Sequence, residues 1–224
     1  MPSIFFPCKD LRGSSVLYLL DSDAAKKICQ YSLLHELAGA LGCGLGDFAV
    51  LPQLKFQLKL IKDDKALAKL GSLEAVDLAR QLVASASEVE VLVESANPLL
   101  LLNRPDIDSG EATLFAALYG NEGAELLSGD KRAYVALSKV EGIPVVDALW
   151  ARLICLEEAL YLILGSAEFQ LVSAKVRARP DVDTSVSIAF GRTAENPLES
   201  VVEALLSYMR SLEADTSGKY VLPR

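Results

Sequence analysis

Short apolar runs that end at an acidic residue and precede a helix-forming stretch recur along this chain, and this repeat most constrains its fold. Residues 15–20 read SVLYLL and precede Asp21, while residues 125–128 read ELLS and precede Gly129 and Asp130. Strands that alternate with helices pair in parallel, and helices cover both faces of the sheet. We therefore expect a three-layer α/β/α fold with a central, mainly parallel sheet.

Hydrophobic periodicity and turn formers place the other elements. Residues 1–165 are expected to form the α/β domain, and residues 166–224 a C-terminal extension with a strand-like segment at 184–190. An apolar stripe from Leu198 to Leu212 predicts an amphipathic helix that packs on the chain's own core. We also expect helices over residues 24–38, 54–70, 73–86 and 148–164, and strands at 142–146 and in at least one of 89–93 and 99–102.

Composition excludes several classes of protein. The chain has 224 residues, of which 51% are hydrophobic and 7% aromatic, so it can bury a core of Leu, Val and Ala and is not of a disordered type. Four widely spaced cysteines and a single histidine, His35, argue against a zinc site. Without a signal peptide or a membrane-spanning apolar run, we expect a cytoplasmic protein with reduced thiols and no membrane partner.

The charge balance is acidic. Lysine and arginine number 22 against 30 aspartate and glutamate, which gives 22 − 30 = −8. Such a net charge repels nucleic acid, so a nucleic-acid enzyme of this composition needs a local basic patch. Lys55, Lys59, Lys62 and Lys69 recur at helical spacing and would line one helix face. A lysine stripe is usually a solvated face, but in this chain it is also the best candidate for binding phosphate.

Acidic residues gather where the predicted strands end and helices begin. Asp108 and Glu111 stand at the mouth of a helix, Asp130 follows one strand, and Asp21 follows another. In a parallel sheet these side chains converge on one edge, where open α/β sheets bind ligands. Three or four carboxylates there suit Mg²⁺ or Mn²⁺. A helix N-cap is an equally good explanation of Asp21 or Asp23 taken alone.

The stretches SVLYLLD, DSGEA, LLSGDKR and GIPVV together resemble a PIN domain, over roughly residues 15–165. PIN domains are metal-dependent ribonucleases, often the toxin half of a toxin–antitoxin pair. The resemblance implies that Asp21, Glu111 and Asp130 match the first, third and fourth acids of the family. It also implies that Ser128 matches a small hydroxyl residue often found there.

The second acid of the PIN family has no clear match. The family places a glutamate in a helix after the second strand, and this chain offers Gln57 in the matching stretch. Glu36 is the nearest acid, but it belongs to the preceding predicted helix. With one carboxylate fewer, the site is expected to hold one metal ion in place of two.

The first functional hypothesis is a PIN-like endoribonuclease that cleaves single-stranded RNA. Asp21, Glu111 and Asp130 would be catalytic and would hold Mg²⁺ or Mn²⁺ together with Asp108. The residues expected to contact RNA are Lys55, Lys59, Arg132 and Ser128. An antitoxin-like protein and a homodimer are the partners that such a toxin would have.

Two other classes of function stay open on the sequence. One is a catalytically degenerate PIN-fold module that binds or regulates, which Gln57 and the acidic surface favour. The other is a phosphatase with Asp21 as nucleophile, because Asp21 and Asp23 form a D-x-D after a strand and Gly129–Asp130 a later G-D. Such phosphatases carry another acid four residues after the G-D aspartate, where this chain has Tyr134.

Overall fold

The computed structural model describes residues 16–91, 98–99 and 104–223, and within them the chain forms an α/β fold around one five-stranded parallel sheet. The strand order is β3-β2-β1-β4-β5, and every pair is parallel. This confirms the predicted three-layer α/β/α class. The strands are β1 (Leu17–Leu20), β2 (Phe48–Val50), β3 (Ser87–Glu88), β4 (Ala124–Ser128) and β5 (Leu153–Cys155).

The strand order reverses at β1. The chain runs outward from β1 through β2 to β3 and then returns to place β4 on the other side of β1, where Tyr18 pairs with both Phe48 and Glu125. Right-handed crossovers in two opposite directions place their helices on opposite faces of a sheet. The reversal lies between β1 and β4, and open α/β sheets usually bind ligands outside the carboxyl ends of the strands at such a point.

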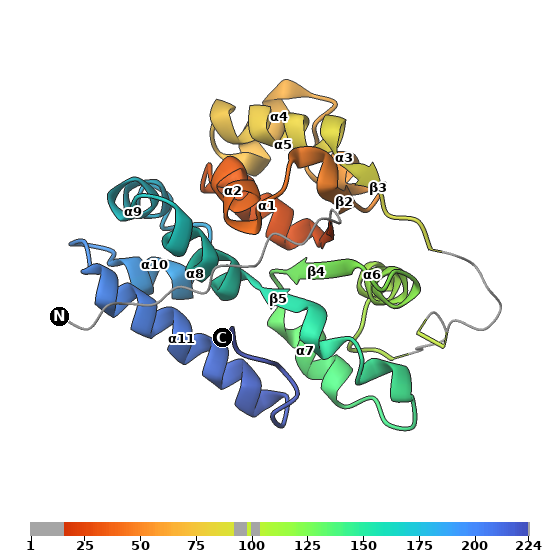
Figure 1. Cartoon of the computed structure of the whole chain (residues 1–224). Helices are drawn as coiled ribbons and strands as arrows, with labels where there is room; N and C mark the ends of the chain where they lie inside the picture. The colour runs from red at the N-terminus through yellow and green to blue at the C-terminus, as the bar shows by residue number, and fades with distance from the viewer. Residues whose placement is uncertain (1–15, 92–97, 100–103, 224) are drawn as a thin grey trace.

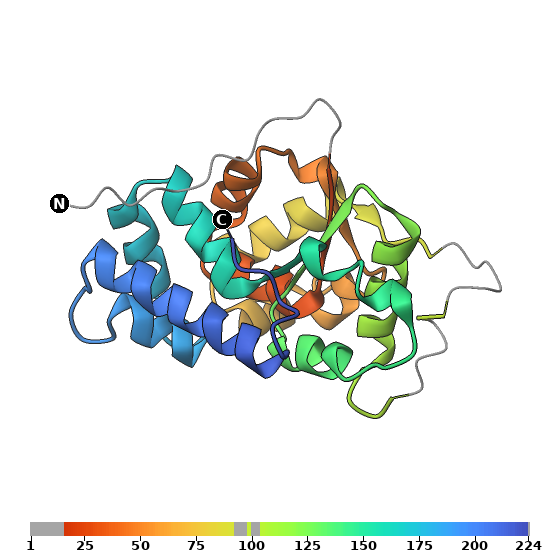
Figure 2. The same cartoon turned by 60° about the horizontal axis from the view of Figure 1, so that its bottom comes forward.

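Figure 1 shows α1–α5 on one side of the sheet and α6 and α7 on the other, while Figure 2 shows the C-terminal helices packed beside this core. The helices on the first side are α1 (Ser22–Gln30), α2 (Leu34–Leu41), α3 (Leu54–Gln57), α4 (Asp63–Leu70) and α5 (Leu73–Ser85). The others are α6 (Ser109–Gly120), α7 (Lys131–Ser138), α8 (Leu156–Ser166), α9 (Phe169–Arg177), α10 (Thr184–Phe190) and α11 (Leu198–Asp215).

Two of the predicted helices are each broken into two. The helix expected over residues 24–38 is α1 and α2, because Ser32 takes a left-handed conformation with φ of 56° between them. The lysine-bearing helix expected over 54–70 is α3 and α4, because Lys59 has φ of 59°. A left-handed residue ends a right-handed helix. The predicted lysine stripe is therefore not one continuous helix face.

The predicted strand at 142–146 is wrong. This segment contains a short 3₁₀ helix, Pro144–Val146, and the fifth strand is β5, which falls inside the helix expected over 148–164. Pro144 has no amide hydrogen to donate to a sheet, so it suits the first turn of a helix better. Of the two segments in which a strand was expected, residues 89–91 follow β3 without being part of a strand, and residue 99 lies in a turn. Residues 92–93 and 100–102 lie outside the described residues.

The strand-like segment expected at 184–190 is also wrong, because it forms helix α10. Asp183 caps this helix: its Oδ1 accepts hydrogen bonds from the amides of Ser185 (3.0 Å) and Val186 (3.1 Å). Such a cap satisfies amides that the first helical turn leaves free, and it outweighs the strand propensity of the segment. The β-branched residues of this segment are therefore part of a helix.

The apolar stripe of the last helix packs on the chain's own core, as predicted. The buried side chains of α11 are Val201, Val202, Leu205, Met209 and Leu212. They belong to the same hydrophobic cluster as the strands. The C-terminal extension therefore shares the core of the α/β domain.

Candidate functional site

Three helices begin at the carboxyl edge of the sheet, and each is preceded by an acidic residue. Asp21, Asp108 and Asp130 occupy the N-cap positions of α1, α6 and α7. The partial positive charge of a helix N-terminus stabilises a nearby carboxylate. The helix N-termini therefore account for acidic residues at these three positions even without a bound ligand.

Asp21 is the most buried of the candidate acids. The structure gives it no side-chain hydrogen bond to the first turn of α1, and its Oδ2 accepts a hydrogen bond from Ser128 Oγ at 3.2 Å. Burial raises the pKa of Asp21, and the neighbouring charge of Asp23 raises it further. A buried carboxylate beside a second negative charge is the electrostatic setting that a cation relieves.

Asp108 and Glu111 form a reciprocal capping box at the start of α6. The amide of Glu111 donates to Asp108 Oδ1 and the amide of Asp108 donates to Glu111 Oε2, both at 2.8 Å. These bonds give the two acids a structural role. Burial raises the pKa of Glu111, and the charges of Asp108, Asp130 and Asp21 add to this rise, in that order. Glu111 therefore lies close enough to the other predicted acids for their charges to act on it.

Asp130 has partners of its own. Its Oδ1 accepts the amide of Arg132 at 2.9 Å, and both carboxylate oxygens contact the Arg132 guanidinium, at 3.0 and 2.6 Å. The guanidinium lowers the pKa of Asp130. Arg132 is 91% exposed, so solvent screens this pair and it contributes little to stability. Asp130 is thus ionised and held by a partner that can move away.

Ser128 connects two of the acids. Its hydroxyl donates to Asp21 and accepts the amide of Asp130 at 3.1 Å. The side chain is buried, with 4% of the residue exposed. These contacts support a role in positioning the acids, and they do not support the RNA contact expected from the sequence.

Two charged residues near the site, Lys27 and Asp183, were missed by sequence reasoning, and so was the pairing of Lys27 with Asp23. Lys27 Nζ lies 2.8 Å from Asp23 Oδ2 and 2.9 Å from Asp183 Oδ2. The spacing of Asp23 and Lys27, four residues apart on a helix, was a usable signal for their pairing. No local pattern could have found Asp183, which is 156 residues from Lys27.

Gly129 allows Asp23 to approach the turn between β4 and α7. A Cβ atom at this position would lie 2.5 Å from Asp23 Oδ2 and 3.0 Å from the amide nitrogen of Ala24. Backbone atoms cannot move aside cheaply, so close packing here requires glycine. The carboxylate of Asp23 therefore lies directly against the segment that carries Asp130.

We predict that Gly129→Ala destabilises the protein by about 1–3 kcal/mol, because the added methyl group overpacks the turn. Urea unfolding would measure the change. Gly120→Ala is the matched control, since a Cβ atom there meets nothing within 4 Å and alanine favours the end of α6. Equal stability of the two variants would contradict the close approach of Asp23.

The predicted phosphate-binding lysines lie on the segment that leaves the site after β2. Lys55 and Lys59 are exposed, and Lys55 Nζ lies 5.2 Å from the ring centroid of Phe56, which is itself 53% exposed. Gln57 is also exposed. Gln53 is the residue of this segment that approaches the acids. Its Nε2 would lie 4.0 Å from a Cβ atom added to Gly110, between Asp108 and Glu111. The amide side chain of Gln53 thus lies near the start of α6.

The acids suit a hard divalent cation in their chemistry. Carboxylate oxygens from three elements face one edge, and their charges raise the pKa of Glu111. Within the described ranges, however, no group of three or more His, Cys, Asp or Glu side chains is placed to hold a metal ion. Binding would therefore require Asp130 to leave Arg132 and Glu111 to turn from its capping bond.

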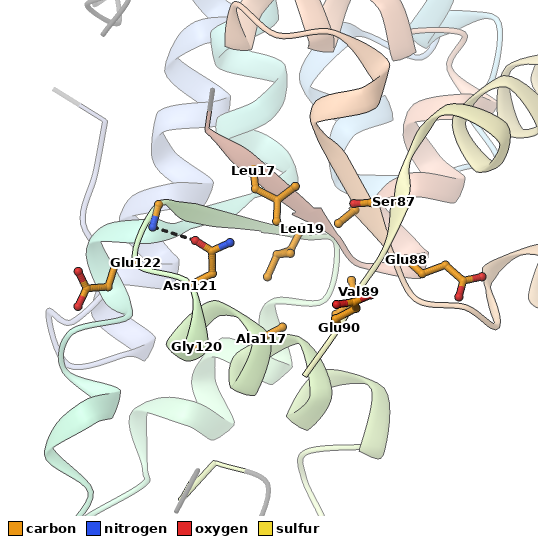
Figure 3. A pocket seen from close by; sticks show the side chains of 12 residues that line it. Leu17, Leu19, Ser87, Glu88, Val89, Glu90, Ala117, Gly120, Asn121 and Glu122 are labelled. Atoms are coloured by element: carbon orange, nitrogen blue, oxygen red, sulfur yellow. Dashed lines mark hydrogen bonds between the residues drawn. The ribbon is translucent and has the colours of Figure 1, made fainter. Parts of the chain in front are cut away.

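A separate cavity of about 720 Å³ lies on the face of the sheet that α6 covers (Figure 3). Leu17 and Leu19 of β1 line its floor, and Ala117 and Gly120 of α6 line one side. The candidate acids are not among its lining residues. The cavity and the acid edge are thus different places in the fold.

Comparisons with protein-family models, curated proteins and solved structures found no match for this chain. In the part of the chain that the structure describes, no helix has the length and apolar character needed to cross a membrane.

Proposed function

We propose that this protein is a PIN-like, metal-dependent endoribonuclease that cleaves single-stranded RNA. The observation that carries the proposal is the position of Asp21 and Asp130 just after β1 and β4, the two strands that flank the reversal of strand order. Glu111 reaches the same edge from α6 and shares their electrostatic field. Open α/β sheets usually bind ligands at such a reversal of strand order.

In this proposal Asp21, Glu111 and Asp130 hold a single Mg²⁺ or Mn²⁺ ion, with Asp108 beside them. Such an ion lowers the pKa of water and stabilises negative charge on the leaving oxygen of a phosphodiester. Other residues of the chain hold the acids in position. Ser128 fixes Asp21 and the start of α7 relative to each other through its two hydrogen bonds.

The exposed cations supply contacts to the RNA backbone. Arg132 is free to turn from Asp130 toward a phosphate because it is 91% exposed. Lys55 on α3 and Lys59, which follows that helix, are exposed and would contact phosphates beyond the site. Basic side chains offset the repulsion that the net charge of −8 would otherwise impose on RNA.

The decisive experiment is cleavage of single-stranded RNA by purified protein, with Mn²⁺ and with a chelator, beside Asp130→Asn. Asparagine caps a helix about as well as aspartate, so α7 should stay intact while the charge is lost. We expect cleavage by the wild type with Mn²⁺ only, and almost none by the variant. Equal cleavage by the two proteins would refute the proposal and reveal a contaminating nuclease.

We predict that Lys59→Gly stabilises the protein by about 1 kcal/mol and weakens RNA binding. Lys59 has φ of 59°, which costs a side-chain-bearing residue energy that glycine avoids. Loss of one phosphate contact should lower the salt slope of binding by roughly 0.7. Ser32→Gly, at φ of 56°, is the control that should gain stability and leave binding unchanged. Unchanged salt dependence in Lys59→Gly would remove this lysine from the interface.

A catalytically degenerate PIN-fold module is the second candidate. It is favoured by the capping bonds that occupy Asp108, Glu111 and Asp130, and by Gln57 in the stretch expected to match the second acid of the family. Calorimetry distinguishes the two candidates, because micromolar Mn²⁺ binding that Asp21→Asn abolishes would count against the degenerate module. An antitoxin-like partner and a homodimer stay predictions.

A further inference from the structure

Large apolar side chains are exposed on the helices that follow β2. Among the described residues eight large hydrophobic side chains are exposed, and four of them lie within residues 56–73: Phe56, Ile61, Leu67 and Leu73. They belong to α3, α4, α5 and the turn between α3 and α4, and both α3 and α4 pack on α5. Single exposed apolar residues are common, whereas several in one part of a surface mark a contact site.

The start of this surface is basic, although the protein is acidic. Residues 52–62 contain three lysines, Lys55, Lys59 and Lys62, and no acidic residue, whereas the net charge of the whole chain is −8. All three lysines are exposed. A local positive charge attracts an anionic partner even where the net charge of the protein would repel it. The partner that fits this surface is therefore anionic and carries apolar faces that can cover the exposed side chains.

An aromatic ring and an ammonium lie together on α3. Phe56 is 53% exposed, and Lys55 Nζ lies 5.2 Å from the centroid of its ring. Exposed aromatic rings beside basic side chains hold single-stranded nucleic acids, because the ring stacks a base while the cation binds the backbone. α3 follows β2, whose carboxyl end lies at the same edge of the sheet as those of β1 and β4. A strand bound at Phe56 can therefore continue to the acids.

We propose that Phe56 is a stacking platform for a base of single-stranded RNA, and that Lys55 and Lys59 bind the neighbouring phosphates. The inference rests on the proposed function, because it describes how the same RNA is held. A single strand offers both an anionic backbone and unpaired bases with flat apolar faces. The bases of a duplex are stacked on one another, so this surface selects single strands. Every base has such a face, so the ring imposes little sequence preference.

The test is the affinity of the whole chain for a short, fluorescently labelled oligouridylate, measured by fluorescence anisotropy with a chelator present, so that neither metal nor cleavage enters the measurement. We expect Phe56→Ala to weaken binding by roughly 5–100-fold, because one base loses its stacking partner. The salt dependence of binding should stay unchanged, since no phosphate contact is lost. Phe56→Tyr keeps the ring and should bind as the wild type does. Phe56→Leu keeps an apolar side chain without the ring and should bind as weakly as Phe56→Ala.

Tyr119→Ala is the matched control, because Tyr119 is an aromatic residue that is 37% exposed on α6, outside this surface, and its removal should leave binding unchanged. Equal affinity of the wild type and a folded Phe56→Ala would overturn the inference and leave the proposed ribonuclease standing. Wild-type affinity in Phe56→Leu would also overturn it, in favour of an acidic protein as the partner of this surface. Failure of the wild type to bind RNA would overturn the proposed function and the inference with it.

Discussion

Asp21→Asn is expected to abolish Mn²⁺ binding, to reduce RNA cleavage by about 10²–10³-fold and to make the protein more stable. The carboxylate is buried beside Asp23, so its charge opposes folding. Asparagine keeps the shape and can still accept the hydrogen bond from Ser128. A loss of activity joined to a gain of stability is typical of a residue kept for its chemistry. RNA cleavage assays and thermal unfolding would measure the two effects.

The gain in stability should depend on pH. The pKa of Asp21 is raised in the folded state, so the folded protein binds this proton more tightly than the unfolded chain does. The stabilisation of the wild type by that proton is complete below the unfolded pKa of about 3.9 and is lost as pH rises through the folded pKa. The advantage of Asp21→Asn should therefore grow with pH across that window. A variant that is less stable than the wild type at neutral pH would contradict this electrostatic picture.

Tyr220→Ala is expected to destabilise the whole protein by about 3–5 kcal/mol, which lowers Tm by roughly 10 °C. Tyr220 follows α11, is 1% exposed, and its ring stacks on that of Tyr134 with centroids 6.2 Å apart. Its hydroxyl donates to Glu158 and accepts the amide of Cys155 at 3.2 Å. Removal of the side chain leaves a cavity and unpaired polar groups beside β5.

Two other variants separate the contributions to this loss. Tyr220→Phe keeps the ring and should lose about 1–3 kcal/mol, because the amide of Cys155 and the carboxylate of Glu158 lose their hydroxyl partner. Tyr119→Ala is the exposed control and should change stability little, since Tyr119 is 37% exposed. If Tyr220→Ala unfolds only the C-terminal helices, the extension folds apart from the sheet and the shared core is disproved.

Part of the candidate site could be predicted because its signals are local. Asp21 follows β1 directly and Asp130 follows β4 after one glycine, and a parallel sheet brings such residues to one edge. The pairing of Ser128 with Asp21 crosses 107 residues, yet it follows from the adjacency of β1 and β4. The engagement of Asp108, Glu111 and Asp130 in helix caps was readable in part, since their spacing is also that of caps.

The amino-acid sequence by itself determined the parallel α/β class, the acids at the ends of β1 and β4, and the buried stripe of α11. These depend on periodicity and on neighbours within one element. Only the tertiary structure decided that residues 184–190 form a helix and that Asp183 joins Lys27 from 156 residues away. The energy of an ion pair depends on the distance between the charges in space, so the order of residues in the sequence does not predict which distant carboxylate pairs with Lys27.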